Sequence, residues 1–301
     1  MGPFVTIEHT KSGAVATVNP HGATVTSFVT SSGEELLFLS RLAKMDGSKA
    51  IRGGIPLVFP QFGKGCNIDM PQHGFLRNNS WKAGVVRDGD TEAVCDFSLS
   101  LTDAVNDRGT GQWGPGADEG YDCNIRLSVS VSSNALATVL SIENSGKIAF
   151  DYQALFHTYY KIHGSAALDK NSCNVSGLAG YSVKDQITEE RYIQGEKIIF
   201  VDREIDRIYT PPSGKNTLDV IIRTGKDGSK INVESLAFAD GVSVPISVVV
   251  WNPHLDKSKG MGDFGDDEYN DMICVEPGIL SGVETIKCSK EMIFTQIISK
   301  E

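Results

Sequence analysis

The amino-acid sequence predicts an all-β protein, built as a β-sandwich or a β-barrel. Two observations lead to this prediction. Short runs of β-branched and aromatic residues recur along the whole 301-residue chain, with turn residues between them. No stretch of twelve or more residues shows the apolar period of an amphipathic helix. Because we find no linker, repeat or low-complexity segment, we expect residues 1–301 to form a single domain.

Each predicted strand is a short alternating or continuously apolar run, bounded by Gly, Pro, Asn, Asp or Ser. In chain order these runs are residues 4–9, 13–18, 23–30, 81–88, 93–103, 123–133, 135–144, 150–162, 172–178, 242–251, 272–277 and 292–299. Ser133 and Asn134 separate two of them and predict a hairpin. The segment from Asp103 to Asp122 is rich in Gly and acidic residues, and we expect it to be a long surface loop.

Composition excludes several classes of function. The formal net charge of −10 argues against a surface for nucleic acid or anionic membrane, because both require a basic patch. The six cysteines are scattered without a CxxC pair, so neither a zinc ribbon nor a redox dithiol is indicated. The sequence shows no secretory signal and no apolar run of about 18 residues, so we expect a cytoplasmic protein.

Residues 51–81 contain two arginines, a histidine and too many Gly and Pro residues for a helix. Arg52 precedes Gly53 and Gly54, which would let the backbone approach a ligand closely. Gln72, His73 and Arg77 follow in one glycine-bearing turn. Guanidinium groups suit phosphate oxygens. The alternative is that both arginines are surface charges.

The run LFHTYYKI at residues 155–162 has the period of a strand. His157, Tyr159 and Lys161 should therefore share one face, and Phe156 and Tyr160 the other. A titratable group in a strongly β-forming strand makes His157 a candidate catalytic residue. The alternative is a histidine on a solvated face.

The run MICVEPG at residues 272–278 places Met272, Cys274 and Glu276 on one face of a second strand. We expect Glu276 to lie at the end of that strand, because Pro277 and Gly278 predict a turn. A carboxylate at the tip of a buried strand is a candidate base, because its desolvation is costly without partners. The alternative is a glutamate in solvent.

Metal ligation is not indicated by any sequence motif. The acidic run DFGDDEYND at residues 263–271 lacks the Gly and Glu positions of a calcium loop, so we expect a solvated loop. The six histidines form no HExxH or HxH arrangement.

Taken together, six motifs resemble those of the glucose-6-phosphate 1-epimerases, the hexose-6-phosphate mutarotases of the aldose 1-epimerase superfamily. In order, they are IRGGIPLVFPQFG, PQHGFLR, LFHTYYKI, EIDRIY, VVVWNP and MICVEPG, and the resemblance extends from about Gly22 to Gly278. The resemblance implies a large antiparallel β-sandwich of the galactose-mutarotase type. It also implies interconversion of the α and β anomers of a hexose 6-phosphate, without cofactor or metal.

The resemblance also implies roles for individual residues. His157 corresponds to the catalytic acid and Glu276 to the catalytic base. The substrate-binding positions correspond to Arg52, Gln72, His73, Arg77 and Asp206. Two features depart from the family: His254 stands where a tryptophan is usual, and the loop from Asp103 to Asp122 is longer than usual.

The chemistry explains why such residues are needed. Ring opening requires a base for the C1 hydroxyl proton and an acid for the ring oxygen, which is worth roughly 10²–10⁴-fold. We expect Glu276 to have a pKa raised towards neutrality and His157 to stay near its ordinary value of about 6.5. Arg52 and Arg77 would hold the 6-phosphate.

Three alternatives to this function remain. A non-catalytic sugar-phosphate-binding protein would be expected to lack His157 or Glu276, and both are present. An aldose 1-epimerase acting on unphosphorylated sugars would use the same pair. A cupin-like metal enzyme would need clustered histidine and carboxylate ligands, which the sequence does not show. We expect a monomer whose partner is its hexose 6-phosphate substrate.

Overall fold

The computed structural model describes residues 3–65, 70–101, 122–195 and 197–301. Among these residues the strands form sheets of three, eight and eleven strands, with antiparallel pairing between neighbours. The predicted all-β fold is confirmed. The expected loop from Asp103 to Asp122 lies outside the described residues, apart from Asp122 itself.

The three sheets are each defined by their strand order. The three-stranded sheet has the order β1 (Val5–His9), β2 (Ala14–Asn19), β3 (Thr24–Val29). The eight-stranded sheet has the order β14 (Arg191–Ile193), β13 (Ser182–Asp185), β16 (Ile205–Thr210), β20 (Ser247–Asn252), β21 (Met272–Ile286), β10 (Phe150–Phe156), β4 (Leu57–Val58), and β11 (Tyr159–Lys161) also pairs with β21. The eleven-stranded sheet has the order β15 (Ile198–Ile199), β12 (Cys173–Ser176), β17 (Leu218–Thr224), β18 (Lys230–Ala239), β22 (Glu291–Lys300), β9 (Ala135–Asn144), β8 (Cys123–Val131), β7 (Ala93–Ser100), β5 (Lys82–Ala83), with β19 (Val242–Val244) on β18 and β6 (Arg87–Asp88) on β7.

Helical structure in the described residues is short. It comprises α2 (His254–Ser258) and the 3₁₀ turns η1 (Leu76–Asn78) and η3 (Glu268–Asn270). No helix in this part of the chain is both long and apolar enough to cross a membrane.

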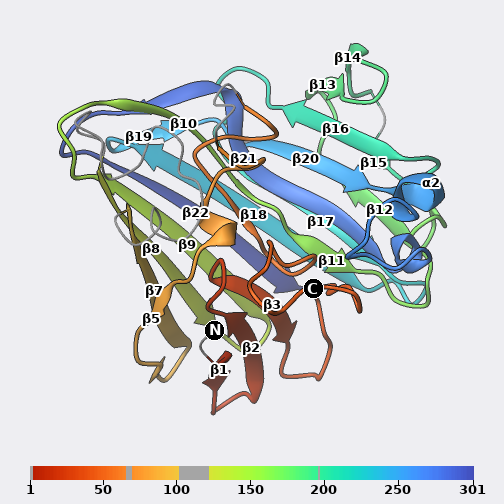
Figure 1. Cartoon of the computed structure of the whole chain (residues 1–301). Coiled ribbons are helices and arrows are strands. Elements are labelled where there is room, and N and C mark those ends of the chain that lie inside the picture. Colours follow the sequence, from red (N-terminus) through yellow and green to blue (C-terminus); the bar gives the residue numbers. More distant parts are fainter. Residues whose placement is uncertain (1–2, 66–69, 102–121, 196) are drawn as a thin grey trace.

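The two large sheets lie face to face, with β20 and β21 over β17 and β18 in Figure 1. Strands of the eleven-stranded sheet alternate buried and more exposed positions, as β8 does along all nine of its residues. Their inward side chains join a main cluster of buried apolar residues that reaches from Ile7 to Ile298. The period-two pattern therefore predicts which face of these strands is buried. That the whole chain forms one domain stays a prediction.

Strands β20 and β21 differ, because both of their faces are buried. All six residues of β20 and the first eight of β21 are buried. One face contributes Ile273 and Val275 to the main cluster, whereas Met272 and Cys274 join a second apolar cluster on the opposite face. The predicted division of residues 272–276 between two faces is confirmed, and loops cover the second face.

Several expectations about individual strands are wrong. Glu276 does not end a strand, because β21 continues without a turn through Pro277 and Gly278 to Ile286. Three predicted runs each form two strands: residues 81–88 form β5 and β6, residues 150–162 form β10 and β11, and residues 242–251 form β19 and β20. Sequence reasoning also missed six strands between residues 182 and 239, although burial alternates along β17 and β18 as it does along β8: β13, β14, β15, β16, β17 and β18.

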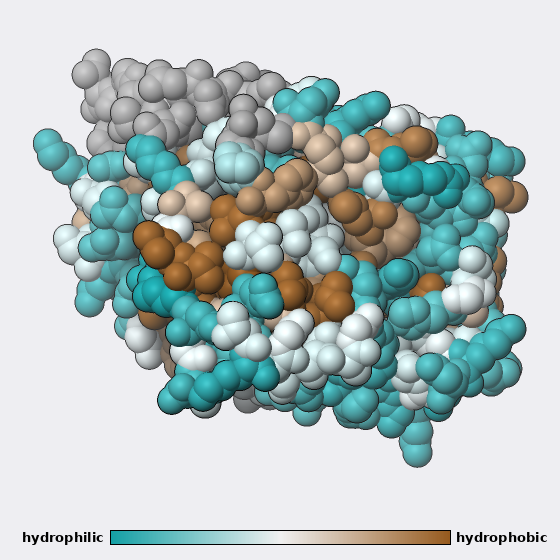
Figure 2. All heavy atoms as spheres, turned by 90° about the horizontal axis from the view of Figure 1, so that it is seen from below, coloured by the Kyte–Doolittle hydropathy of each residue, from teal (hydrophilic) through white to brown (hydrophobic). Residues whose placement is uncertain are grey.

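The outer surface is mainly polar. Figure 2 shows one face of the molecule, on which hydrophilic residues surround a central apolar patch. A polar exterior follows from the alternation of the strands, since the outward positions of β8 carry Asn124, Arg126, Ser128 and Ser130.

Candidate active site

The second face of β20 and β21 carries a cavity of about 310 Å³. Six of the seven predicted site residues line it, and they come from segments spread over most of the chain: Arg52, Gln72, His73, His157, Asp206 and Glu276. Phe62, Val249, Trp251 and Met261 supply apolar walls. The volume is at the lower end of the range for small-molecule sites, roughly 300–1,000 Å³.

Strand register brings His157 and Glu276 together. Leu155 pairs with Gly278 and Tyr159 with Cys274, so the same register places His157 opposite Glu276. Between these pairs the ladder is interrupted opposite Pro277, which has no N–H to donate. The N–H of His157 points to the other edge of the strand and donates to the carbonyl of Pro56, at 2.9 Å, in register with the pairing of β10 and β4. This bond joins the His157 backbone to the 51–81 segment.

The pair is buried and close. His157 Nδ1 lies 3.4 Å from Glu276 Oε1, and the two side chains are 11% and 2% exposed. Glu276 Oε2 is buried and has no hydrogen-bond partner among the described residues. A buried oxygen without a partner beside a cavity points to a ligand that completes its hydrogen bonding.

Burial shifts both groups towards their neutral forms. The pKa of Glu276 is raised well above its ordinary value, first by burial and then by the nearby Asp206 carboxylate. The pKa of His157 is lowered, first by burial and further by the charges of Arg77 and Arg52. The expected rise for Glu276 is confirmed, whereas the expectation that His157 keeps its ordinary pKa is wrong because its ring is enclosed.

Arg52 is held in place by an aromatic and an acidic partner. Its Nε and Nη2 atoms lie 3.3 and 3.4 Å from the two carboxylate oxygens of Asp263, and Nη1 donates to the Tyr159 hydroxyl at 3.1 Å. Burial works against its charge, but Tyr159 and Asp263 raise the pKa of Arg52 above its ordinary value. Arg52 is therefore a fixed cation in the cavity wall, and the alternative that it is a surface charge is wrong.

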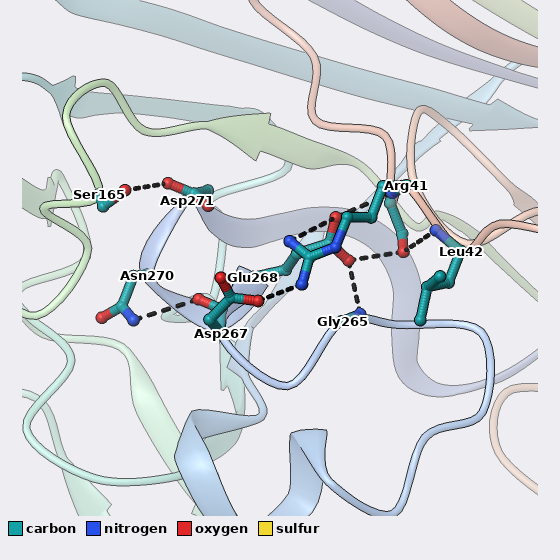
Figure 3. A network of polar contacts seen from close by, with 9 residues as sticks. Arg41, Leu42, Ser165, Gly265, Asp267, Glu268, Asn270 and Asp271 are labelled. Atoms are coloured by element: carbon teal, nitrogen blue, oxygen red, sulfur yellow. Dashed lines mark hydrogen bonds and ion pairs between the residues drawn. The ribbon is translucent and has the colours of Figure 1, made fainter.

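The acidic run at residues 263–271 is anchored rather than solvated, which corrects the sequence-based expectation. Asp263 is buried and also pairs with Lys49, at 2.8 Å. Glu268 is buried as well, and its carboxylate accepts hydrogen bonds from Ser40 and from the backbone N–H groups of Arg41 and Gly265 (Figure 3). These contacts fix the segment that holds Arg52, and charge composition alone could not show them.

The two glycines after Arg52 serve the protein's own packing. A Cβ added at Gly54 would lie 2.0 Å from the carbonyl oxygen of Val25, and one at Gly53 would lie 2.6 Å from Leu39 Cα. Gly54 also has a φ of +64°. The expectation that these glycines open the backbone to a ligand is therefore wrong. The space where a side chain would lie is filled by the neighbouring backbone.

His73 is neutral and oriented. The backbone N–H of Gly63 donates to its Nδ1 at 3.2 Å, which places the proton of a neutral ring on Nε2. Burial, followed by the charges of Arg77 and Arg52, lowers the pKa of His73 to about 3. Gln72 and His73 both line the cavity, so these neighbours present amide and imidazole groups to it.

Asp206 lies on β16, at the other side of the cavity. It accepts a hydrogen bond from the Gln186 side chain at 2.6 Å, and both residues line the cavity together with Lys257 of α2. Burial raises the pKa of Asp206 above its ordinary value. Asp206 and Gln186 thus offer acceptors and donors for hydroxyl groups of a ligand.

Arg77 is the one predicted site residue that does not line this cavity. It lines an adjoining pocket of about 280 Å³, which shares Arg52 and Gln72 with the cavity and also contains Lys49. Its Nη2 donates to the carbonyl of Gln72 at 2.9 Å, and its Nε is buried without a partner among the described residues. Arg77 therefore lies behind the Gln72 turn.

Sequence reasoning missed several residues of the site. Asp263 was assigned to a solvated loop, and Tyr159, Trp251 and Lys257 were given no role. Cys274 is the least expected, because its Sγ lies 3.9 Å from His157 Nδ1. Strand parity had placed Cys274 beside Glu276, so this contact could have been found once the two strands were paired. His254, the departure from the family, packs its ring against Tyr269 at 5.4 Å and does not line the cavity.

Comparison with known proteins places these features in context. A sequence model of the family described as aldose 1-epimerase matches residues 3–285. A protein of Cenchrus ciliaris, named as a candidate glucose-6-phosphate 1-epimerase, is 32% identical over 96% of this chain and 85% of its own length. A protein of Escherichia coli K12 with the same name is 29% identical over 90% of this chain and 81% of its own length.

Solved structures show the same fold. The crystal structure of a candidate mutarotase from Salmonella typhimurium matches with a TM-score of 0.77 at 23% identity, covering 95% of this chain and 87% of that one. A protein of Synechocystis matches with a TM-score of 0.75 at 20% identity, covering 100% and 97%. The predicted β-sandwich of the galactose-mutarotase type is thereby confirmed.

Proposed function

This chain belongs to the aldose 1-epimerase family, and we propose that it interconverts the α and β anomers of hexose 6-phosphates. The family makes the chain an isomerase, and the two relatives described above are named for glucose 6-phosphate as substrate. The observation that carries the proposal is the buried pair His157–Glu276 at the wall of a small polar cavity.

The protonation of the pair suits the reaction. A neutral carboxylic acid beside a neutral imidazole holds the same number of protons as a carboxylate beside an imidazolium. In either arrangement the pair has one proton to give and one site to receive a proton. Ring opening and ring closure each need one proton donor and one proton acceptor. The pair can therefore serve both directions without gaining or losing a proton overall.

In the proposed reaction Glu276 is the base and His157 the acid. Glu276 takes the proton of the C1 hydroxyl, the C1–O1 bond becomes a carbonyl and the bond from C1 to the ring oxygen breaks. His157 donates its proton to the departing ring oxygen. After rotation about the C1–C2 bond, the roles reverse and the ring closes on the other face of the carbonyl. His157 must carry the proton when the ring opens, and transfer within the pair supplies that state.

The remaining residues would bind the substrate. Gln72, His73 and Asp206 line the cavity and offer hydrogen-bonding groups for the sugar hydroxyls. Arg52 is the fixed cation of the cavity, and we place the 6-phosphate beside it, towards the adjoining pocket that contains Arg77 and Lys49. A charge-assisted contact of this kind distinguishes a phosphorylated from a free sugar.

The test is NMR exchange between the anomeric signals of glucose 6-phosphate and, separately, of free glucose, with and without the protein. We expect the protein to accelerate exchange of the phosphorylated sugar much more than exchange of glucose. Faster exchange of glucose would instead support an aldose 1-epimerase for unphosphorylated sugars. Binding of glucose 6-phosphate without faster exchange would support the non-catalytic alternative. A monomeric state, a cytoplasmic location and independence of cofactors stay predictions.

A further inference from the structure

Three side chains at the centre of the site form a cluster of potential metal ligands. His157, Cys274 and Glu276 each offer one ligand atom, and these atoms lie within 4.8 Å of one another. The Nδ1 atom of His157 is 3.9 Å from Cys274 Sγ and 3.4 Å from Glu276 Oε1. Sequence motifs could not show the cluster, because its ligands come from strands that are more than a hundred residues apart in the chain.

The fold explains the juxtaposition. Cys274 and Glu276 are two residues apart on β21 and therefore point to the same face. His157 lies opposite Glu276, where the pairing with β21 is interrupted. All three residues are buried, whereas His157 and Glu276 also line the cavity. The cluster thus has a closed side formed by the sheet and an open side towards the cavity.

The ligand set matches the preferences of zinc. Thiolate sulfur, imidazole nitrogen and carboxylate oxygen bind Zn²⁺ at about 2.0–2.3 Å in a tetrahedron, so neighbouring ligand atoms lie about 3.3–3.6 Å apart. Two of the three separations, 3.4 and 3.9 Å, are within a few tenths of an ångström of that geometry, and all three ligand atoms lie within 4.8 Å of one another. Three protein ligands and one open position are typical of a metal site that a small molecule can reach.

We propose that His157, Cys274 and Glu276 form an inhibitory site for a thiophilic divalent cation of the Zn²⁺ and Co²⁺ class. The thiolate and the carboxylate together neutralise the two charges of the cation. Binding releases the thiol proton and the carboxylic proton, so affinity should rise with pH. Mg²⁺ and Ca²⁺ prefer oxygen ligands and should not bind. The proposal of inhibition rests on the proposed function, but metal binding does not.

A metal at this position would occupy both groups of the proton-transferring pair. The cation and the hexose 6-phosphate would then compete for the same side chains. We therefore expect Zn²⁺ to raise the apparent KM for the sugar phosphate, and a chelator to restore the original value. The nearby charges of Arg52 and Arg77 oppose a cation and should limit its affinity.

Cobalt provides the direct test, because a cobalt–thiolate bond absorbs light in a characteristic charge-transfer band. Metal-stripped protein is titrated with Co²⁺, and we expect the band to saturate at one equivalent, to vanish on adding Zn²⁺ and to persist with Mg²⁺. Cys274→Ser should abolish the band. Cys288→Ser is the matched control, because Cys288 is an exposed free cysteine, and should leave the band unchanged.

A second variant keeps the proposal testable if Cys274→Ser does not fold. His157→Asn retains the thiol but removes the nitrogen ligand, so it should weaken Co²⁺ binding at least tenfold. Circular dichroism establishes folding of each variant. Absence of the band in wild-type protein, or an equal band in folded Cys274→Ser, would overturn the metal site. A cobalt band in a protein that does not exchange anomers would count against the proposed function and leave the metal site standing.

Discussion

At the scale of single residues, the central feature is a carboxyl group whose pKa is raised by burial. Glu276 is 1% exposed and one of its oxygens has no partner among the described residues. Such a group costs folding free energy that a solvent-exposed glutamate does not. Active sites commonly retain costs of this kind because the same environment tunes the pKa for proton transfer.

The pKa shift of Glu276 predicts how stability depends on pH. The unfolded chain releases this proton above about pH 4.3, whereas the folded protein retains it to higher pH. The folded state then binds more protons, so stability falls as pH rises, by up to about 1.36 kcal/mol per pH unit. We expect Glu276→Gln to be more stable than wild type, by a margin that grows as pH rises above about 4.3.

Chemical denaturation at several pH values measures that margin. Glu291→Gln serves as the control, because Glu291 is exposed and stays in water in both states. A margin that is constant with pH, or a destabilised Glu276→Gln, would contradict a raised pKa for Glu276.

The second prediction at this scale concerns Arg52. Arg52→Ala should raise KM for hexose 6-phosphate roughly tenfold to a hundredfold, because a charge-assisted contact is worth about 1.5–3 kcal/mol. KM for free hexose should change much less. Steady-state kinetics on both sugars measures the two values, with Arg203→Ala as control, since Arg203 is exposed and does not line the cavity. Equal losses on both sugars would make Arg52 a structural residue instead.

At the scale of elements, the site depends on close packing between the 51–81 segment and its neighbours. Gly54 sits against the carbonyl oxygen of Val25 with a φ of +64°, and its own carbonyl accepts the N–H of Tyr159. This glycine therefore connects the amino-terminal sheet to the start of β11, two residues after His157. An added methyl group would push these elements apart.

Gly54→Ala should accordingly lose about 2–5 kcal/mol of stability, through backbone strain and overpacking together. Gly13→Ala is the matched control, because Gly13 also has a positive φ, of +76°, but no atom within 4 Å of an added Cβ. It should lose only about 1–2 kcal/mol. Urea denaturation compares the two variants, and similar losses in both would show that the contact with Val25 is unimportant.

The elements also show what local sequence can predict. Alternation correctly placed His157 and Tyr159 on one face and Phe156 on the other, because the period of a strand is a local property. It failed for Glu276, because Pro277 and Gly278 predict a turn although β21 continues through them. The missing N–H of Pro277 coincides with the interruption of the pairing at His157. This effect depends on which segment lies beside Pro277, and local sequence does not reveal that.

At the scale of the whole molecule, the site is assembled by contacts between distant segments. Arg52 and Asp263 are 211 residues apart, and Ser40 and Glu268 are 228 apart. Motif resemblance identified residues that line the cavity, because it carries information on such long-range relations. Composition alone misread residues 263–271 as solvated, since a buried carboxylate looks the same in sequence as an exposed one.

The layered architecture explains why one face of β20 and β21 is free for chemistry. Their other face joins the main apolar cluster and holds the two sheets together. The site face is closed by loops and by a smaller apolar cluster, which includes Tyr159, Trp251 and Cys274. Stability and function are thus divided between the two faces of the same strands, so changes to polar side chains of the cavity should leave the fold intact.

The rate of anomer exchange in Glu276→Gln, with His157→Asn as its partner, tests the central claim most directly. NMR exchange on glucose 6-phosphate should show kcat lowered by about 10² or more in each variant. The double variant should be little slower than the worse single one, because the two residues act as a unit. Both variants should still bind the sugar phosphate. A folded Glu276→Gln protein that exchanges the anomers at nearly the wild-type rate would contradict the account.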